Sequence, residues 1–475
     1  MPTLLLPHAT HDESAPAAAR SPRRAAASPA PARTLAWARE LATSRWRTAL
    51  EIALGALAVA FVLGHLPLPD PLDVGYRSCA RIVALLFLCG ALAGAPGVAF
   101  TRSRIGIALL GLSLAATASV VAAGGRTAAV SALWSALGVF HAVRAVAADE
   151  RGRRRLLHGL GLLCVGVLAR ELWREPALLA FHEQHRHALA TEHPNTLGFA
   201  MALLLPVLLA ATAHRRLRAA ACVYAAAGTI VLLATYSRAA WLALAGSVVA
   251  LALTTRPPPR SRAGARHADR SSRWLVEAAL AVALVLALAV AVVSRDRTGG
   301  DTQRLRILGT SWSLFREHWP LGVGFGSGNL EPLFPVRYLE RNGESLFLFH
   351  SHDLYLDLLT GSGVVGALAA LVLFATVARV AWRGLSRARH RAARAEAAGA
   401  ATSFGVFLAL GLVDTPLYHG RLLLLSVVLW AMLDVVGECS VRSHEPKKAA
   451  WLRVHDGESP HAAVRRERHR VCSTL

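Results

Sequence analysis

Residues 104–123 read RIGIALLGLSLAATASVVAA, a run in which only the first residue is charged. A helix needs roughly 17–25 mostly apolar residues to span a hydrocarbon core of about 30 Å. Similar runs recur along the 475-residue chain, which is 54% hydrophobic and has a mean hydropathy of +0.41. They do not alternate polar and apolar residues, as the strands of a membrane barrel do. The sequence therefore predicts an all-α polytopic membrane protein.

The apolar runs predict about twelve transmembrane helices. They cover residues 48–66, 79–100, 104–123, 127–147, 156–173, 195–213, 218–235, 238–254, 274–293, 358–378, 398–415 and 421–437. We therefore expect one membrane domain at 46–437. Residues 1–45 are rich in Ala, Pro and Arg and bury too little apolar surface to fold alone, so we expect a disordered basic tail. Residues 438–475 form a second basic tail.

The distribution of charge predicts the orientation in the membrane. The net charge of +22 comes from 52 Lys and Arg against 30 Asp and Glu. With the N-terminus in the cytoplasm, most basic residues fall in the two tails and in cytoplasmic loops such as 151–155, 256–273 and 379–394, as the positive-inside rule requires. Both termini are therefore expected in the cytoplasm, with basic residues near anionic lipid. Basic residues that alternate with spans form no single face for nucleic acid, so nucleic-acid partners are excluded.

The longest outer connection, residues 294–357, has a composition of its own. A helix is predicted to begin at Asp301 or Thr302 and to end at Pro320. Its apolar residues recur at spacings of three and four, which predicts one apolar stripe on a helix that lies on the membrane surface or caps the bundle; the stripe comprises Leu305, Leu308, Trp312, Phe315 and Trp319. Gly322, Gly324, Gly326 and Gly328 then predict a turn where backbone passes close to a bulky neighbour.

Arg238 lies in a short outer loop, Tyr236-Ser237-Arg238, at the mouth of the predicted eighth span. One interpretation is an arginine that extends to the lipid headgroups. The positive-inside rule disfavours arginine on this side, however, and a three-residue loop leaves it little freedom. A forked guanidinium suits a diphosphate better than an ammonium does. Arg238 is therefore a candidate ligand for a diphosphate.

His352 is the candidate general base. An unperturbed histidine titrates near pH 6.5 and acts as a base when it lies within hydrogen-bond reach of its proton. Asp353, beside it, or Asp357, one helical turn later, is expected to orient the ring. The alternative is an ordinary interfacial histidine. His193 and Asn195 flank Pro194 at the start of a span, where proline is common, so they are only secondary polar candidates.

Metal and disulfide chemistry are not expected. The six cysteines form no CxxC pair. His182, His185 and His187 have no cysteine partners and only scattered carboxylates, so a metal site there is disfavoured. The sequence thus predicts a site that needs neither metal nor cofactor.

Four motifs, in this order, resemble the O-antigen ligase and polymerase superfamily. They are His193-Pro194-Asn195-x2-Gly198, Arg238-x3-Leu242, the stretch from Arg304 through Trp312 to Pro320-Leu-Gly-Val-Gly-Phe-Gly, and His352-Asp353-x9-Gly363-x2-Gly366. They cover about residues 190–380. The family usually carries Asn, Ser or Gln where this chain has Asp353. That departure either gives His352 a charge partner or marks a different acceptor.

The resemblance implies a membrane-embedded glycosyltransferase of the GT-C type in the bacterial inner membrane. It would move a glycan from an undecaprenyl diphosphate carrier to an acceptor hydroxyl on the periplasmic face, the acceptor being lipid A–core or another glycan. Arg238 would bind the donor diphosphate, with Arg304 or Arg306 assisting, and His352 would be the base. His193, Asn195, Asp353, Gly363 and Gly366 would be secondary residues of the site.

Three functions remain open at this stage. The first is ligase-type transfer, which the motifs favour, and the second is polymerisation of the glycan on its carrier, which the same motifs allow. The third is a secondary transporter, a class that usually carries ionisable residues within its spans and shows two related halves. The predicted spans hold few charges and the halves show no repeat, which disfavours transport.

Overall fold

The computed structural model describes residues 45–60, 73–92, 103–174, 194–254, 300–345, 350–388 and 391–442. Within these ranges every regular element is a helix and no strand occurs. Residues 45–60 are helical, and the helices that follow are α2 (Asp73–Leu92), α3 (Arg104–Ala123), α4 (Ala128–Ala147), α5 (Glu150–Arg174), α6 (Pro194–Ala211), α7 (Arg218–Ala234), α8 (Arg238–Thr254), α10 (Gly300–Glu317), α11 (Ser327–Leu330), α12 (Phe334–Asn342), α13 (Leu354–Arg387), α14 (Arg391–Leu410) and α15 (Gly420–Arg442).

Five of the described helices are long and apolar enough to cross a membrane, namely α3, α4, α5, α13 and α15. The apolar parts of α6, α7 and α8 are shorter. Large apolar side chains face outward on the long helices, among them Ile107, at 62% exposed, and Leu371, at 60%. Such faces fit lipid better than water, and the chain is a polytopic membrane protein. The total of twelve spans stays a prediction, since residues 274–293 and most of both tails lie outside the described residues.

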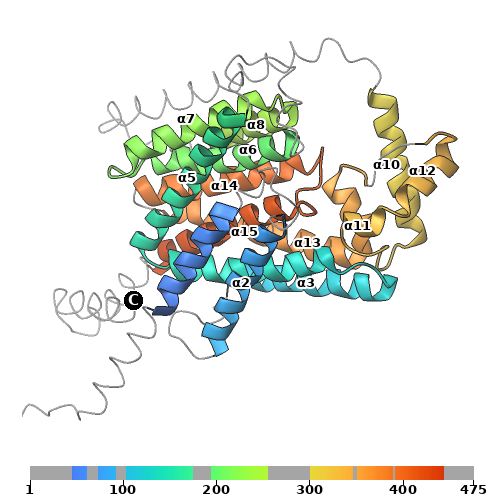
Figure 1. Cartoon of the computed structure of the whole chain (residues 1–475), viewed down its shortest axis with the longest axis horizontal. Coiled ribbons are helices and arrows are strands. Elements are labelled where there is room, and N and C mark those ends of the chain that lie inside the picture. The colour runs from blue at the N-terminus through green and yellow to red at the C-terminus, as the bar shows by residue number, and fades with distance from the viewer. Residues whose placement is uncertain are drawn as a thin grey trace, which may run out of the picture.

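Helix α15 lies in the middle of the bundle and packs against α4, α13 and α14 (Figure 1). Its fully buried Trp430 meets Phe404 and Phe407 of α14, with ring centroids 6.2 and 5.1 Å apart. Edge-on aromatic contacts of this kind stabilise a core beyond their buried area. A second group of helices, α5 to α8, packs around α14 and α6.

Contacts between helices fix which helix ends lie together. The hydroxyl of Ser403 in α14 donates to the carbonyl of Leu203 in α6, and Gly399 lies against Val207. Contacts therefore move toward the end of α6 as they move toward the start of α14, so the two helices are antiparallel. The start of α6 therefore lies beside the end of α14. Gly198 touches Ser237, which brings the start of α8 to the same place.

The start of α13 also lies at this end of the bundle, because Leu354 donates to the carbonyl of Gly411, just after α14. Helices α10, α11 and α12 gather there as well, as Figure 1 shows in yellow and orange. We call this the α10–α12 end. The arginines in the first turns of α5 and near the end of α13 lie at the opposite end.

Helix α13 breaks at Gly363, whose φ of 62° and ψ of −166° only glycine adopts readily. The break exposes backbone groups that the preceding segment then binds. The N–H of Val364 donates to the carbonyl of Trp319 over 2.9 Å, and the N–H of Val323 donates to the carbonyl of Thr360 over 3.0 Å. The broken helix is therefore joined directly to the segment that follows α10.

Gly363→Ala is expected to destabilise the protein by about 2 kcal/mol, because a Cβ would impose both backbone strain and a clash. The new Cβ would meet the Pro320 carbonyl oxygen at 2.4 Å. Thermal unfolding of the purified full chain in detergent measures the loss. Gly246→Ala is the matched control, because Gly246 lies inside α8 with open space around it. Equal melting temperatures for the two variants would contradict this role of Gly363.

The predicted glycine turn passes close to its neighbours. Gly322, Gly324 and Gly326 all have positive φ, and a Cβ at Gly322 would meet the carbonyl of Gly361 at 2.5 Å. The neighbour that the sequence analysis predicted for this turn is therefore the backbone of α13 at its break.

The predicted surface helix corresponds to α10, which ends at Glu317, three residues before Pro320. Its predicted apolar stripe is not its packing face. Ile307 and Leu314 pack against Phe334 and Tyr338 of α12, whereas Trp312 remains 49% exposed. The stripe also includes Leu305, at 70% exposed, and Trp319, at 59%. An exposed tryptophan-containing stripe favours contact with the membrane surface over a role in capping the bundle.

Candidate functional site

His352 sits in a tight turn that leads into α13. Its φ is 54°, in the left-handed region that costs a non-glycine residue about 1–3 kcal/mol and recurs at functional sites. Its ring lies 4.2 Å from that of His350, centroid to centroid. The side chain is 38% exposed, so it is accessible to a substrate.

Asp357 holds this turn in place from within α13. Its carboxylate is fully buried and accepts hydrogen bonds from the backbone N–H and the hydroxyl of Ser351, at 2.9 and 2.6 Å. Thr415 donates to the other oxygen, and Nδ1 of His350 lies 3.0 Å from it. A buried carboxylate needs such donors. Asp357 therefore fixes the turn rather than orienting His352.

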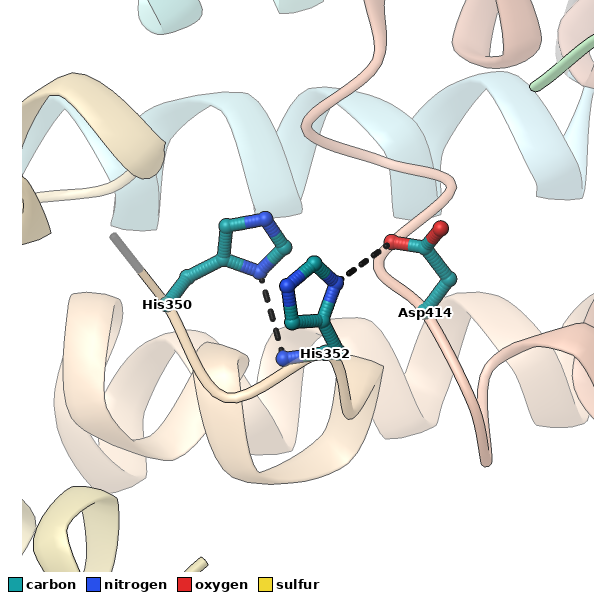
Figure 2. A group of neighbouring side chains, drawn as sticks. All are labelled: His350, His352 and Asp414. Atoms are coloured by element: carbon teal, nitrogen blue, oxygen red, sulfur yellow. Dashed lines mark hydrogen bonds and ion pairs between the residues drawn. The ribbon is translucent and has the colours of Figure 1, made fainter. Parts of the chain in front are cut away.

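Asp414 is the carboxylate that faces His352. Its Oδ1 lies 3.6 Å from Nδ1 of His352 (Figure 2). The same oxygen lies 3.4 Å from Nε2 of His419. Burial alone would raise the pKa of Asp414, but the nearby ring nitrogen of His352 and the hydrogen bond with His419 outweigh burial and hold that pKa well below its usual range. An ionised Asp414 beside Nδ1 favours the tautomer whose proton is on Nδ1, which leaves Nε2 as the basic nitrogen.

The expectation that Asp353 or Asp357 orients His352 is therefore wrong for the geometry observed. Asp353 is the N-cap of α13, and its carboxylate accepts the N–H of Leu356 over 2.9 Å. Asn and Ser cap helices as well as Asp does, so the departure from the usual family residues retains this capping function. The other role considered for Asp353, as the mark of a different acceptor, stays a prediction.

Arg238 is the first residue of α8 and is half-buried. Tyr236, two residues before it, has φ 49°; among the described residues, Tyr236 and His352 are the two non-glycine residues with positive φ. Both strained turns thus adjoin predicted site residues. The helix contacts described above put Arg238 and His352 at the same end of the bundle, although α8 packs mainly on α14 and α6 and not on α13.

The two helper arginines on α10 differ in their surroundings. Arg304 donates to the carbonyl of Leu412 over 3.2 Å, two residues from Asp414. Arg306 instead pairs with Glu344, beyond α12, at 2.5 Å. The geometry therefore favours Arg304 over Arg306 as the residue that faces the site.

The remaining secondary residues fall into three groups. His193 lies outside the described residues. Asn195 is half-buried in the first turn of α6, at the α10–α12 end. Gly363 and Gly366 shape α13: Gly363 makes the break, and Gly366 packs against Ser362 of the preceding turn.

Sequence reasoning missed Asp414 and His419 as site residues. They lie in the short connection 414–421, which was recognised only as a loop between two spans. The available signal was an aspartate and a histidine within six residues of a predicted outer loop. Their distance in sequence from His352 hid the relationship, which depends on how α14 ends beside the start of α13.

His350, His352 and Asp414 are also close enough to bind one cation together. One ligand atom of each lies within 4.8 Å of the others. Two histidines and a carboxylate are a common donor set for divalent transition metals. The expectation of a metal-free site therefore stays a prediction.

Residues 220–371 match the family model described as O-antigen ligase. The matched segment runs from α7 into α13 and includes Arg238, Arg304, His352 and Gly363. This segment carries the family's domain, which supports membership of the O-antigen ligase superfamily. None of the curated proteins compared with it matches the chain. Membership of this superfamily implies a glycosyltransferase-like enzyme that uses lipid-linked glycans.

Asp414→Asn is expected to lower the rate of glycan transfer at least about tenfold, part of the 10²–10⁴ that a positioned base contributes. The amide of asparagine offers both a donor and an acceptor to Nδ1 of His352, so the tautomer that leaves Nε2 basic is no longer favoured. Initial rates of the variant and the wild type measure the loss. Asp353→Asn is the matched control, because asparagine retains the helix cap. Equal rates for Asp414→Asn and the wild type would contradict the pairing.

Proposed function

We propose that the protein transfers a glycan from an undecaprenyl diphosphate carrier to an acceptor hydroxyl, as an O-antigen ligase. The observation that carries the proposal is the coincidence of the two strained turns, at Tyr236 and His352, with the two motif residues at one end of the bundle. Strain of this kind persists where the surrounding structure holds it, often for function.

The proposed reaction is a single displacement. The acceptor hydroxyl oxygen attacks the anomeric carbon, its proton passes to Nε2 of His352, and the bond from that carbon to the diphosphate oxygen breaks. The electron pair leaves with the diphosphate, whose charge Arg238 and Arg304 balance. Fixed guanidinium groups act strongly in a site of low dielectric. Configuration at the anomeric carbon inverts.

The orientation is proposed from the distribution of arginines. The opposite end carries arginines in the first turns of α5, at residues 151–155, at residues 215–218 where α7 begins, and at the end of α13. The positive-inside rule assigns that end to the cytoplasm and the α10–α12 end, with the site, to the periplasm. A polyprenyl carrier presents its finished glycan on that side without need of a nucleotide.

Deletion of the gene in its source bacterium distinguishes the ligase from a polymerase. Loss of a ligase leaves long glycan chains on the carrier, whereas loss of a polymerase leaves single repeat units. Carrier-linked glycans are extracted and separated by size beside the parent strain. Accumulation of long chains supports the ligase function. Accumulation of single repeat units would contradict it and support the polymerase function. An unchanged pool of carrier-linked glycan would contradict both functions.

Transfer is expected to persist after chelation, because the proposed charge balance uses arginines. The purified full chain is treated with EDTA, exchanged into metal-free buffer and assayed for initial rate. An unchanged rate is the expected result. A loss that Zn²⁺ or Mn²⁺ restores would instead mean that His350, His352 and Asp414 hold a catalytic cation.

A further inference from the structure

A cavity of about 470 Å³ opens between α3 and α13 at the end of the bundle opposite to His352. Its floor is apolar and includes Ile107, Ala108, Gly111, Ala369 and Val372. Gly111 has open space where a side chain would be. Two of these floor residues also face outward, namely Ile107, at 62% exposed, and Val372, at 57%. The groove is therefore open toward the lipid.

Three arginines line the mouth of this groove: Arg104 at the start of α3, and Arg379 and Arg383, one turn apart near the end of α13. Within the described parts of the chain, no carboxylate forms an ion pair with any of them. The mouth therefore concentrates positive charge that the described protein does not neutralise.

Other arginines at the same end of the bundle are paired. Arg47 pairs with Asp149 at 2.5 Å, and Arg144 with Asp434 at 2.9 Å. Clustered arginines repel one another and favour an anion that bridges them. The contrast indicates that the three arginines at the groove are placed for an external ligand.

We infer that this groove binds an anionic phospholipid of the cytoplasmic leaflet, its phosphate on the three arginines and an acyl chain along the floor. Basic pockets between transmembrane helices on this side suit lipid phosphates. The apolar floor distinguishes a lipid from a free anion, because inorganic phosphate gains nothing from Ile107 or Val372. The groove is separate from the proposed catalytic site, and its assignment to the cytoplasmic leaflet rests on the orientation proposed above.

The test titrates the delipidated full chain in detergent with phosphatidylglycerol and, separately, with phosphatidylcholine, and counts bound lipid by native mass spectrometry. We expect saturable binding of phosphatidylglycerol and at least about tenfold weaker binding of phosphatidylcholine. Arg379→Gln with Arg383→Gln should weaken phosphatidylglycerol at least about tenfold. The matched control removes the same charge from an exposed loop at the same end, by Arg215→Gln with Arg216→Gln, and should change binding less than about twofold.

A second variant, Gly111→Leu, fills the floor and keeps all three arginines. It should weaken phosphatidylglycerol binding, and a size-exclusion profile like that of the wild type shows that it folds. Equal weakening by the two arginine pairs would overturn the site in favour of diffuse surface charge. Unchanged lipid binding by Gly111→Leu, together with competition by inorganic phosphate, would overturn the lipid in favour of a soluble anion.

Discussion

His352→Ala is expected to lower the rate of glycan transfer by about 10²–10⁴-fold, the contribution of a positioned general base. Alanine removes the nitrogen that takes the acceptor proton but retains the turn, which Asp357 holds through Ser351. Initial rates are measured with the full chain in proteoliposomes and a polyprenyl-diphosphate-linked glycan. Most of the loss should appear in kcat, because the proton is transferred only in the transition state.

His318→Ala is the matched control for this variant. His318 follows α10 at the same end of the bundle and is exposed. Among the described residues, its side chain hydrogen-bonds only to the carbonyl of Leu314. Its rate should stay within about twofold of the wild type, as is usual for an exposed side chain outside a site. A similar loss in both variants, or nearly full activity of His352→Ala, would contradict the assignment of His352 as the general base.

Arg238→Ala is expected to lower kcat/KM by about 10²–10³-fold, the cost of removing one preorganised donor from developing charge. Arg238→Lys should recover only part of that loss, since an ammonium cannot bind a diphosphate with a planar fork. Kinetics with varied donor concentration provide the measurement. Arg126→Ala is the control, an exposed arginine at the same end that pairs with Glu331. Equal activity of the lysine variant and the wild type would contradict bidentate binding.

The helical membrane architecture followed from the sequence because apolar runs of spanning length leave few alternatives. The run at 104–123 coincides with α3 in the structure. Boundaries were less predictable where polar residues extend a helix beyond the apolar run. Helix α13 begins at Leu354, whereas its predicted span begins at residue 358. The capping side chain of Asp353 sets this start, and hydropathy does not register a cap.

The site was predictable where residues lie in one motif and not where the fold joins distant segments. His352 and Gly363 lie close together in sequence and were recognised together. The partner of His352 was not, because Asp414 follows by sixty-two positions (414 − 352). Two nearby aspartates offered simpler alternatives. In the structure, Asp353 caps α13 and Asp357 binds Ser351 in the turn.

The same distinction applies to the arginines of α10. Arg304 and Arg306 are two positions apart, so they project from different faces of one helix. The sequence did not indicate which face meets the site. The structure distinguishes them by their partners, a backbone carbonyl in the 411–419 connection for Arg304 and Glu344 for Arg306.

The most direct test of the central claim compares Arg238→Ala and His352→Ala in a strain that lacks the chromosomal gene. Surface polysaccharide and carrier-linked glycan are followed by gel, with membrane levels of each variant measured in parallel. The account predicts that both variants reach normal levels, lose surface polysaccharide and accumulate carrier-linked glycan. Normal surface polysaccharide from both variants would contradict it and would bring the transporter interpretation forward.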